Sequence, residues 1–487
     1  MQNRRPKIWI SVLIVLTAAA LVFTFAGASA VKADADNVEY VQAASFGDPS
    51  AAEGINVRFN NYAEGNGTLR WMTDLSVSEG TEKISVSHEY PARRNVSQVE
   101  AFKDEIQIYP YLYNDPKLNE YAKEIAGDLK AGESKGVEIR LADYIDSIPV
   151  AANYAVGTSY YGSEMSFNDK TKETELTDKV NEALSKVFGV KVPDGMTASM
   201  NVYRRADAGG ELSYDFYVMD FVLNGKAMAA YFDCLARGQY FEGAYYVYVY
   251  QQSSLEERGL VLLPDGSMSC KVVRIPVTEN GKTPDNHPWY ELDTDNITVT
   301  ADLGDDFKTL QHSLIDGGTK ALVCGTSGGR VRAYIVDFAA GGTVRTIDIC
   351  AEAEHCSILF KGDWFVLDVP GEGYYVVHPQ GGTYSVFFAP TDGSVEKAEV
   401  KRNEQWRNGN ATFDADFSDG RLAVASFAGR TIENVVNGRT YEGFAGSGIS
   451  LAVYTQAGLR YYTMYESDLF RLQYPILSEY MCSVEIR

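Results

Sequence analysis

The sequence lacks several of the short motifs that mark common metal and nucleotide sites. It has no HExxH zinc-binding pair, no P-loop and no glycine-rich dinucleotide fingerprint. Histidine is scarce, with five in 487 residues, and no two stand at the spacing of a zinc-ligand pair. These absences favour a protein that is not an enzyme and carries no cofactor, although they leave enzymatic activity open.

Cysteine is also sparse, and its spacing shows no CxxC pair. The six cysteines stand at positions 234, 270, 324, 350, 356 and 482, and none precedes residue 234. An even number outside the cytoplasm allows up to three disulfides, but there is no dense framework for a chain of this size. We expect mostly buried thiols that pack as small hydrophobic groups, with room for one bridge.

Basic residues are in the minority, with 44 Lys and Arg against 66 Asp and Glu and a net charge of −22. Such a charge opposes binding to nucleic acid and to anionic lipid, so we expect no nucleic-acid partner. Hydrophobic residues make up 45% of the chain and aromatic residues 12%, which is typical of a globular protein.

One uncharged apolar run, residues 8–25, follows Arg4, Arg5 and Lys7. Its length suits a bilayer, and the basic flank predicts a cytoplasmic N-terminus with everything beyond about residue 31 on the outside. Two interpretations stay open. The run is a single-pass anchor in the cell membrane, or a signal peptide cleaved after Ala30, which would release a secreted protein.

The remaining chain divides by its periodicity. Residues 31–54 are small and polar and predict a stalk or linker, and 55–90 alternate as β-strands do. Residues 91–200 predict a mixed α/β insertion with helices near 115–131 and 174–188, the first beginning with Asp115 as its cap. Strand-like runs fill 201–487, and the apolar run 244–250 should lie inside a sheet.

An internal repeat is the strongest structural signal. Three segments read as a hairpin with a glycine turn, namely 314–324, 358–367 and 417–425. Each is followed by a second hairpin, and these span 333–344, 373–384 and 451–459. Two successive hairpins in roughly 40 to 45 residues have the size of one β-propeller blade.

In this feature the chain resembles the β-propeller repeat proteins, clearly over about 300–470 and less so over 40–90 and 200–300. The resemblance implies a mainly β, propeller-like repeat domain with the α/β segment as a smaller insertion. The Trp-Asp and Gly-His signatures of the best-known blade family are missing, so no functional family is implied. The alternative is a β-sandwich, or stacked meanders, built from ordinary glycine-containing hairpins.

One acidic loop is a candidate calcium site, formed by Asp414, Asp416 and Asp419 before Gly420. Several oxygens from a short loop suit a hard cation, but the spacing departs from Asp-x-Asp-x-Asp-Gly by one residue. An Asp-Gly turn between two strands explains Asp419 and Gly420 equally well. Calcium is the only metal that the sequence suggests.

Taken together, these features favour a non-enzymatic binding or sensory module of the cell envelope. Its partner would be a protein, a peptide or an envelope glycan. Aromatic residues such as Trp289 and Tyr290, or Tyr461 and Tyr462, could stack on sugars, although most tyrosines in sheets pack against their neighbours. Two alternatives stand beside this one. The first is a secreted carbohydrate-active hydrolase with paired carboxylates, and the second is a structural envelope scaffold.

Overall fold

The computed structural model describes most of the chain from residue 38 to 487. The described ranges are 38–63, 69–89, 104–112, 115–156, 159–161, 170–206, 212–223, 225–227, 236–249, 271–282, 288–304, 307–352, 356–391, 401–402, 413–436, 439–467 and 477–487. The predicted membrane segment, 8–25, lies outside these residues. Among the helices within them, none is both long enough and apolar enough to span a bilayer.

The described chain is mainly antiparallel β-structure with two α-helices, α2 (Pro116–Gly127) and α3 (Lys170–Phe188). It divides into two compact units. Unit 1 combines Met1–Val96, Val366–Val376 and Phe387–Arg487, and unit 2 combines Ser97–Phe365 and Val377–Val386. The two units are described separately below.

Unit 1 joins the first and last strands of the described chain. Its four-stranded sheet has the order β32 (Leu477–Ile486), β2 (Ile55–Ala63), β3 (Leu69–Ser78) and β4 (Thr81–Glu89). Its larger sheet has the order β1 (Tyr40–Gly47), β31 (Gly458–Ser467), β30 (Arg439–Thr455), β29 (Arg421–Val436) and β27 (Lys401–Arg402), with β28 (Phe413–Ser418) also paired to β29.

The two sheets of unit 1 share one apolar core. Phe59 and Leu75 from the smaller sheet and Leu451 and Tyr461 from the larger one are fully buried in it. Burial of this alternating set is what holds the strands in register, since a slip of one residue would turn every apolar side chain toward water.

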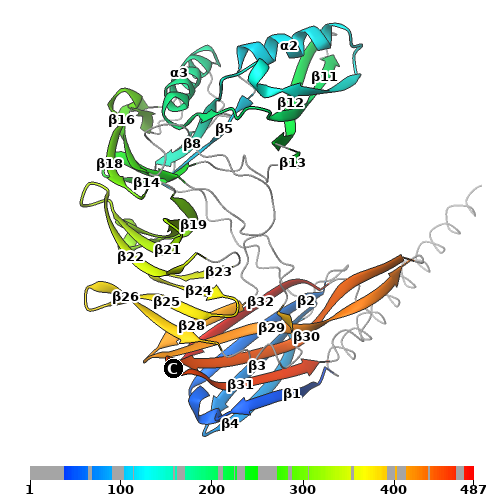
Figure 1. Ribbon diagram of the computed structural model, residues 1–487, viewed down its shortest axis with the longest axis vertical. Helices are drawn as coiled ribbons and strands as arrows, with labels where there is room; N and C mark the ends of the chain where they lie inside the picture. The colour runs from blue at the N-terminus through cyan, green and yellow to red at the C-terminus, as the bar shows by residue number, and fades with distance from the viewer. Residues whose placement is uncertain are drawn as a thin grey trace, which may run out of the picture. The chain divides into compact units, whose positions relative to one another are not determined.

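Strand β1 departs from the sequence-based expectation for 31–54. Tyr40–Gly47 falls in the predicted stalk, yet it pairs with β31 along its length (Figure 1). Its alternation is weak because it is an edge strand with few buried side chains, and Val41 is 66% exposed. Backbone pairing with β31, rather than its own composition, therefore makes it a strand.

The predicted hairpins are all present. One meander contains β19 (Lys308–Ile315), β20 (Lys320–Ser327), β21 (Arg330–Asp337) and β22 (Thr343–Ala351), and the next contains β23 (Ser357–Lys361), β24 (Trp364–Val369), β25 (Gly373–Gln380) and β26 (Thr383–Pro390). Strands β28 to β31 form the third, with β28 paired to β29 and β30 to β31. Glycine turns close these hairpins at positive φ, as at Gly342 and Gly420.

The largest sheet of unit 2 places the predicted apolar run near its centre. Its order is β17 (Pro288–Leu292), β16 (Lys271–Lys282), β15 (Ala244–Val249), β14 (Ala236–Phe241), β5 (Glu105–Pro110), β8 (Val150–Val156) and β9 (Ser159–Tyr161), with β18 (Thr298–Asp302) also on β16. Strand β15 is flanked on both sides, and its residues from Ala244 to Tyr248 are buried. The short strands β7 (Ser147–Ile148) and β10 (Val190–Lys191) pair with each other.

The second sheet of unit 2 has the order β13 (Lys226–Ala227), β12 (Leu212–Leu223), β11 (Thr197–Ala206) and β6 (Ser134–Arg140). Helix α2 covers one of its faces (Figure 1). The helix starts as the sequence predicts, because the Asp115 carboxylate accepts hydrogen bonds from the amides of Lys117 and Leu118 at 2.9 and 3.0 Å. This sheet runs across position 200, where the sequence placed a domain boundary.

Candidate functional site

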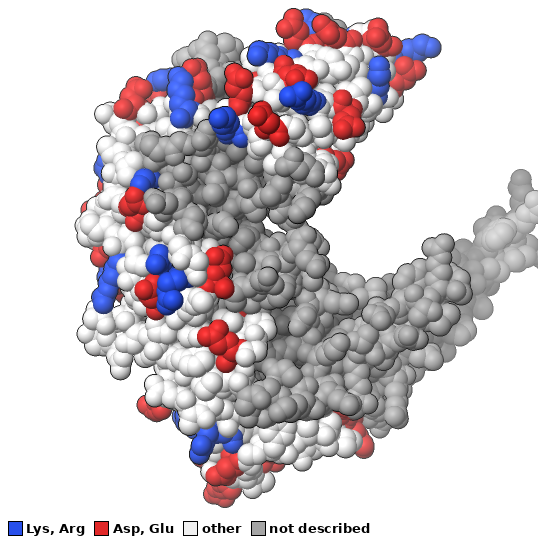
Figure 2. Space-filling view, viewed as in Figure 1, with Lys and Arg blue, Asp and Glu red and all other residues white. Residues whose placement is uncertain are grey.

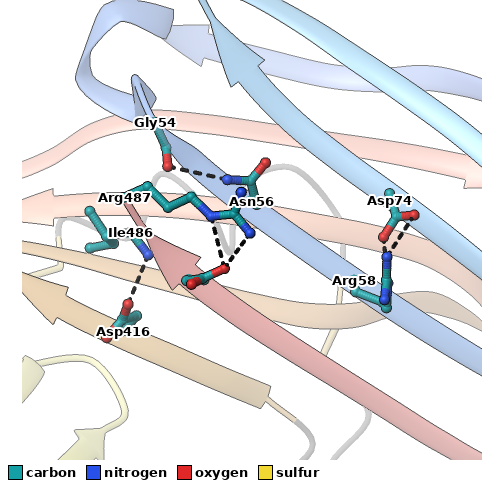
Figure 3. Close-up of polar contacts among 8 residues, drawn as sticks. Gly54, Asn56, Arg58, Asp74, Asp416, Ile486 and Arg487 are labelled. Atoms are coloured by element: carbon teal, nitrogen blue, oxygen red, sulfur yellow. Dashed lines mark hydrogen bonds and ion pairs between the residues drawn. The ribbon is translucent and has the colours of Figure 1, made fainter.

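The three aspartates of the predicted calcium loop do not converge. Asp414 accepts a hydrogen bond from the Val484 amide at 2.7 Å. Asp416 accepts one from the Ile486 amide at 2.8 Å (Figure 3). Asp419 stands in the two-residue turn between β28 and β29, with a φ of 52°. Among the described residues, no cluster of three or more His, Cys, Asp or Glu could hold a metal ion.

The carboxylates of Asp414 and Asp416 instead bind the edge of the last strand. Strand β32 pairs with β2 on one side. The amides of Val484 and Ile486 donate hydrogen bonds to these two carboxylates of β28. Figure 3 also shows how the chain end is held. The Arg487 guanidinium binds Glu485, and the Asn56 side chain donates to the Gly54 carbonyl. The Arg487 amide donates to the same carbonyl at 3.1 Å. Two aspartates of the predicted calcium loop therefore satisfy backbone amides at the edge of β32.

The densest polar cluster in the described part of unit 1 surrounds Glu82 of β4. Its carboxylate accepts hydrogen bonds from Gln42, at 3.1 and 3.2 Å, and from the Thr463 hydroxyl at 2.9 Å. The phenols of Tyr461 and Tyr465 donate to it as well. One glutamate of the smaller sheet is thereby bound by four side chains of β1 and β31.

The electrostatics of this cluster argue against a catalytic role. Burial, and then the hydrogen bond and charge of Glu82, raise the pKa of both Tyr461 and Tyr465. A nucleophile needs the opposite shift, so neither phenol is activated. Four donors also occupy the carboxylate oxygens of Glu82, which leaves them little capacity to accept from a ligand. We interpret the cluster as a joint between the two sheets.

The sequence contains two GxSxG patterns, centred on Ser134 and Ser327. Only the surrounding structure decides whether such a serine can act as a nucleophile. A nucleophile elbow requires a sharp turn from a strand into a helix. Ser134 instead opens β6, and Ser327 ends β20 next to the hairpin turn Gly328–Gly329. Neither serine occupies the position of a nucleophile.

Two of the described cysteines are buried, and His312 has a buried ring nitrogen. Cys324 and Cys350 are buried, Cys356 and Cys482 are partly buried, and burial raises the pKa of the Cys324 thiol well above its ordinary value. Such a thiol is inert toward electrophiles. His312 of β19 has a fully buried Nδ1, and burial followed by the charge of Arg237 lowers its pKa to about 4.

Of the aromatic residues that sequence analysis proposed for sugar stacking, Tyr461 and Tyr462 are not accessible. Tyr461 is fully buried and Tyr462 is 1% exposed. The ring of Tyr462 stacks on Phe46, with centroids 4.8 Å apart. This expectation was wrong because two adjacent residues of an inner strand both became buried, one on each face of its sheet.

Accessible aromatic rings occur on the face of the sheet β13-β12-β11-β6 that is turned away from α2. We call this surface the open face. It consists of alternate residues of three strands, and these are Ser134, Gly136, Glu138, Ser199, Asn201, Tyr203, Arg205, Ser213, Asp215, Tyr217 and Met219. None of them is buried, whereas Met200, Val202 and Phe216 on the other face are.

A tyrosine pair stands at the middle of the open face. Tyr203 and Tyr217 meet edge to face with centroids 5.7 Å apart, and Tyr203 is 37% exposed. The Asn201 side chain lies beside them over Gly136, where an added Cβ would come within 2.8 Å of its Oδ1. Glycine at this position therefore leaves room for an amide group next to two phenol rings.

The open face contains three charged residues, Arg205, Asp215 and Glu138. Arg205 and Asp215 form an ion pair at 2.9 Å beside the tyrosines. Around α2 in the same unit, Figure 2 shows basic and acidic side chains interspersed. A near-neutral surface with aromatic rings and amide, hydroxyl and carboxyl groups suits an uncharged polar ligand better than an ionic one.

The comparisons with known proteins identify no family. No family model matches the chain, and no curated protein matches it. Among solved structures, a Lactobacillus plantarum protein aligns over 80% of this chain and 94% of its own, with 11% identity and a TM-score of 0.22. The core factor of S. cerevisiae aligns over 74% and 61%, with 8% identity and a TM-score of 0.14. Likeness at this level supports no argument about fold or function.

Proposed function

We propose that this chain is a propeller-like, non-enzymatic binding module of the cell envelope that recognises a glycan through the open face. The extracytoplasmic location rests on the apolar run 8–25 and its basic flank, whether that run is kept as an anchor or removed. The observation that carries the binding role is the pair of exposed Tyr203 and partly exposed Tyr217 beside Asn201.

Three features support the propeller-like part of the proposal. Meanders of four strands recur along the chain, which is the pattern of propeller blades. The last strand, β32, completes the sheet of β2 to β4, and the first strand, β1, extends the sheet of β31. A ring of repeats has to close where its two chain ends meet. Sheets that combine strands from both ends of the chain would hold such a ring closed.

The chemistry of the open face favours a sugar over other ligands. Phenol rings offer apolar faces to the C–H groups of a sugar ring, while the Asn201 amide and the serine hydroxyls match its hydroxyl groups. The Arg205 charge is already neutralised by Asp215, which disfavours an anionic ligand. Peptidoglycan fragments and neutral oligosaccharides are therefore the first probes.

The test is calorimetric titration of the full chain with peptidoglycan fragments and with neutral oligosaccharides. Tyr203→Ala and Tyr217→Ala should each weaken binding at least tenfold, since a stacked ring contributes on the order of 1.4 kcal/mol or more. Leu212→Ala is the matched control. Leu212 is an exposed apolar residue of the same strand, β12, but alternation places it off the open face.

The outcomes separate the candidate ligands. Glycan binding that both tyrosine variants weaken and the control does not would support the proposal. Binding that neither variant changes would place the ligand site elsewhere, and absence of binding to every glycan would overturn the glycan assignment. Turnover of a glycan during the titration would favour the hydrolase alternative.

A further inference from the structure

Unit 2 contains a second kind of polar cluster, at the contact between its largest sheet and the β19 to β22 sheet. The contact is mostly apolar. Tyr246 and Tyr248 of β15 pack there with Val323 of β20 and Tyr334 of β21, all of them buried. Tyr246 also stacks on Phe338 with centroids 5.4 Å apart. Separation of these sheets would expose a substantial apolar area to water.

His312 lies at this contact. It is paired in register with Val323 and therefore shares the side of the sheet that faces β15. Its ring meets Tyr248 edge to face, with centroids 5.4 Å apart and an interplanar angle of 86°. The imidazole is thus enclosed between the two sheets, and its protonation would place a charge in a desolvated position.

Charged residues face His312 from the opposite sheet. Arg237 of β14 stands directly across from Tyr248, and Glu105 of β5 pairs with Arg237 at 3.7 Å. From the other elements at this point come Val323, Tyr334 and Tyr248, and none of these changes its charge in acid. A proton on His312 would therefore meet both desolvation and the nearby guanidinium.

The two titratable groups respond to acid in opposite directions. Burial and then Arg237 lower the pKa of His312 to about 4, so the closed contact resists protonation of the imidazole. Burial raises the pKa of Glu105 although Arg237 opposes the shift, so the closed contact accepts a proton there. Acid therefore opens the contact through His312, and Glu105 offsets part of this effect.

We propose that the contact between β14–β15 and β19 is an acid-sensitive joint, in which His312 against Arg237 loosens the two sheets as the pH falls. The inference is independent of the proposed glycan site, which lies on a different sheet of unit 2. It gives an envelope protein a local response to external acid while unit 1 stays closed.

Hydrogen exchange of the full chain at pH 7.5 and pH 5.0, corrected for the intrinsic rate, tests the joint. A histidine with a pKa of 6.5 when open and about 4 when closed increases the opening constant about 30-fold at pH 5. Because Glu105 offsets part of this, we expect at least fivefold faster exchange in β14, β15 and β19, and less than twofold in β2 and β31.

Three variants sharpen the test. His312→Phe should abolish the acid response, and His312→Gln serves the same purpose if the phenylalanine does not fold. Glu105→Gln removes the offset, so its response should exceed that of the wild type. His378→Gln, at a partly exposed histidine of β25, is the matched control and should respond as the wild type does.

Two results would overturn the inference. The first is a wild-type protein that shows no acid response in β14, β15 and β19, or shows the same response in unit 1. The second is an acid response that persists in both His312 variants. Either result would mean that His312 is a buried histidine without influence on the sheet contact.

Discussion

Glu82 in unit 1 and Glu105 in unit 2 are two partly enclosed glutamates that the protein accommodates in different ways. Glu82 is surrounded by neutral donors, with hydroxyls from Tyr461, Thr463 and Tyr465 and an amide from Gln42. Glu105 has the cation Arg237 at 3.7 Å, and burial still raises its pKa. One carboxylate is thus bound by several neutral dipoles, and the other by one nearby charge.

The two arrangements differ in desolvation. Four oriented donors replace the water around Glu82 without burying a second charge. The ion pair of Glu105 requires both partners to lose water, and the attraction between them repays only part of that cost. The first arrangement should therefore stabilise its unit, whereas the second should be close to neutral.

The largest effect should follow from Glu82→Gln. The new amide cannot accept from all four donors, so buried hydroxyls lose their partner, and we expect a loss of about 3 kcal/mol in unit 1. Denaturant-dependent hydrogen exchange in β2 and β31 would measure it for this unit alone. Glu485→Gln is the control, because Glu485 pairs with Arg487 at the exposed chain end and should cost less than about 0.5 kcal/mol. Equal losses in the two variants would show that the cluster has no special role.

An intermediate effect is expected in alkali. Tyr461 and Tyr465 have a raised pKa, mainly through burial and then through Glu82, so their contribution to stability is complete below pH 10 and is lost as the pH rises. Each tyrosine should cost about 1.4 kcal/mol per pH unit above 10. Phenolate absorbance followed together with unfolding would show it. Tyr465→Phe should remove one of the two contributions, and an unchanged slope would contradict the assignment.

The smallest effect should follow from Glu105→Gln. Because burial raises the pKa of Glu105 despite Arg237, the ion pair gives little net stability, and a neutral isostere should change the stability of unit 2 at pH 7 by less than about 0.5 kcal/mol. Hydrogen exchange in β5 and β14 measures this. A loss as large as that of Glu82→Gln would mean that the ion pair with Arg237 is essential, and the contrast between the two glutamates would disappear.

Local patterns in the sequence were sufficient for the hairpins and for helix α2. Alternating apolar residues around a glycine turn specify a hairpin wherever one sheet face is buried, and Asp115 before Pro116 specifies a helix start. Strand β1 had no such signal, because an exposed edge strand depends on the partner that it pairs with. The open face was missed for a similar reason. Its tyrosines, in β11 and β12, resemble the packing tyrosines elsewhere until the position of α2 shows which face is covered.

The calcium loop illustrates the same limit. Asp414 and Asp416 have the composition of a cation site, but 70 residues separate them in sequence from the β32 amides that they bind. No local pattern could have revealed those partners.

The sequence by itself determined the apolar N-terminal run, the acidic charge, the β-rich composition and the position of each repeated hairpin, since these depend on residues close together in the chain. Tertiary structure alone decided which carboxylates are neutralised by dipoles, which histidine is enclosed between two sheets and which tyrosines face water. Those properties depend on burial and on partners far apart in sequence, and only the packed sheets bring such partners together.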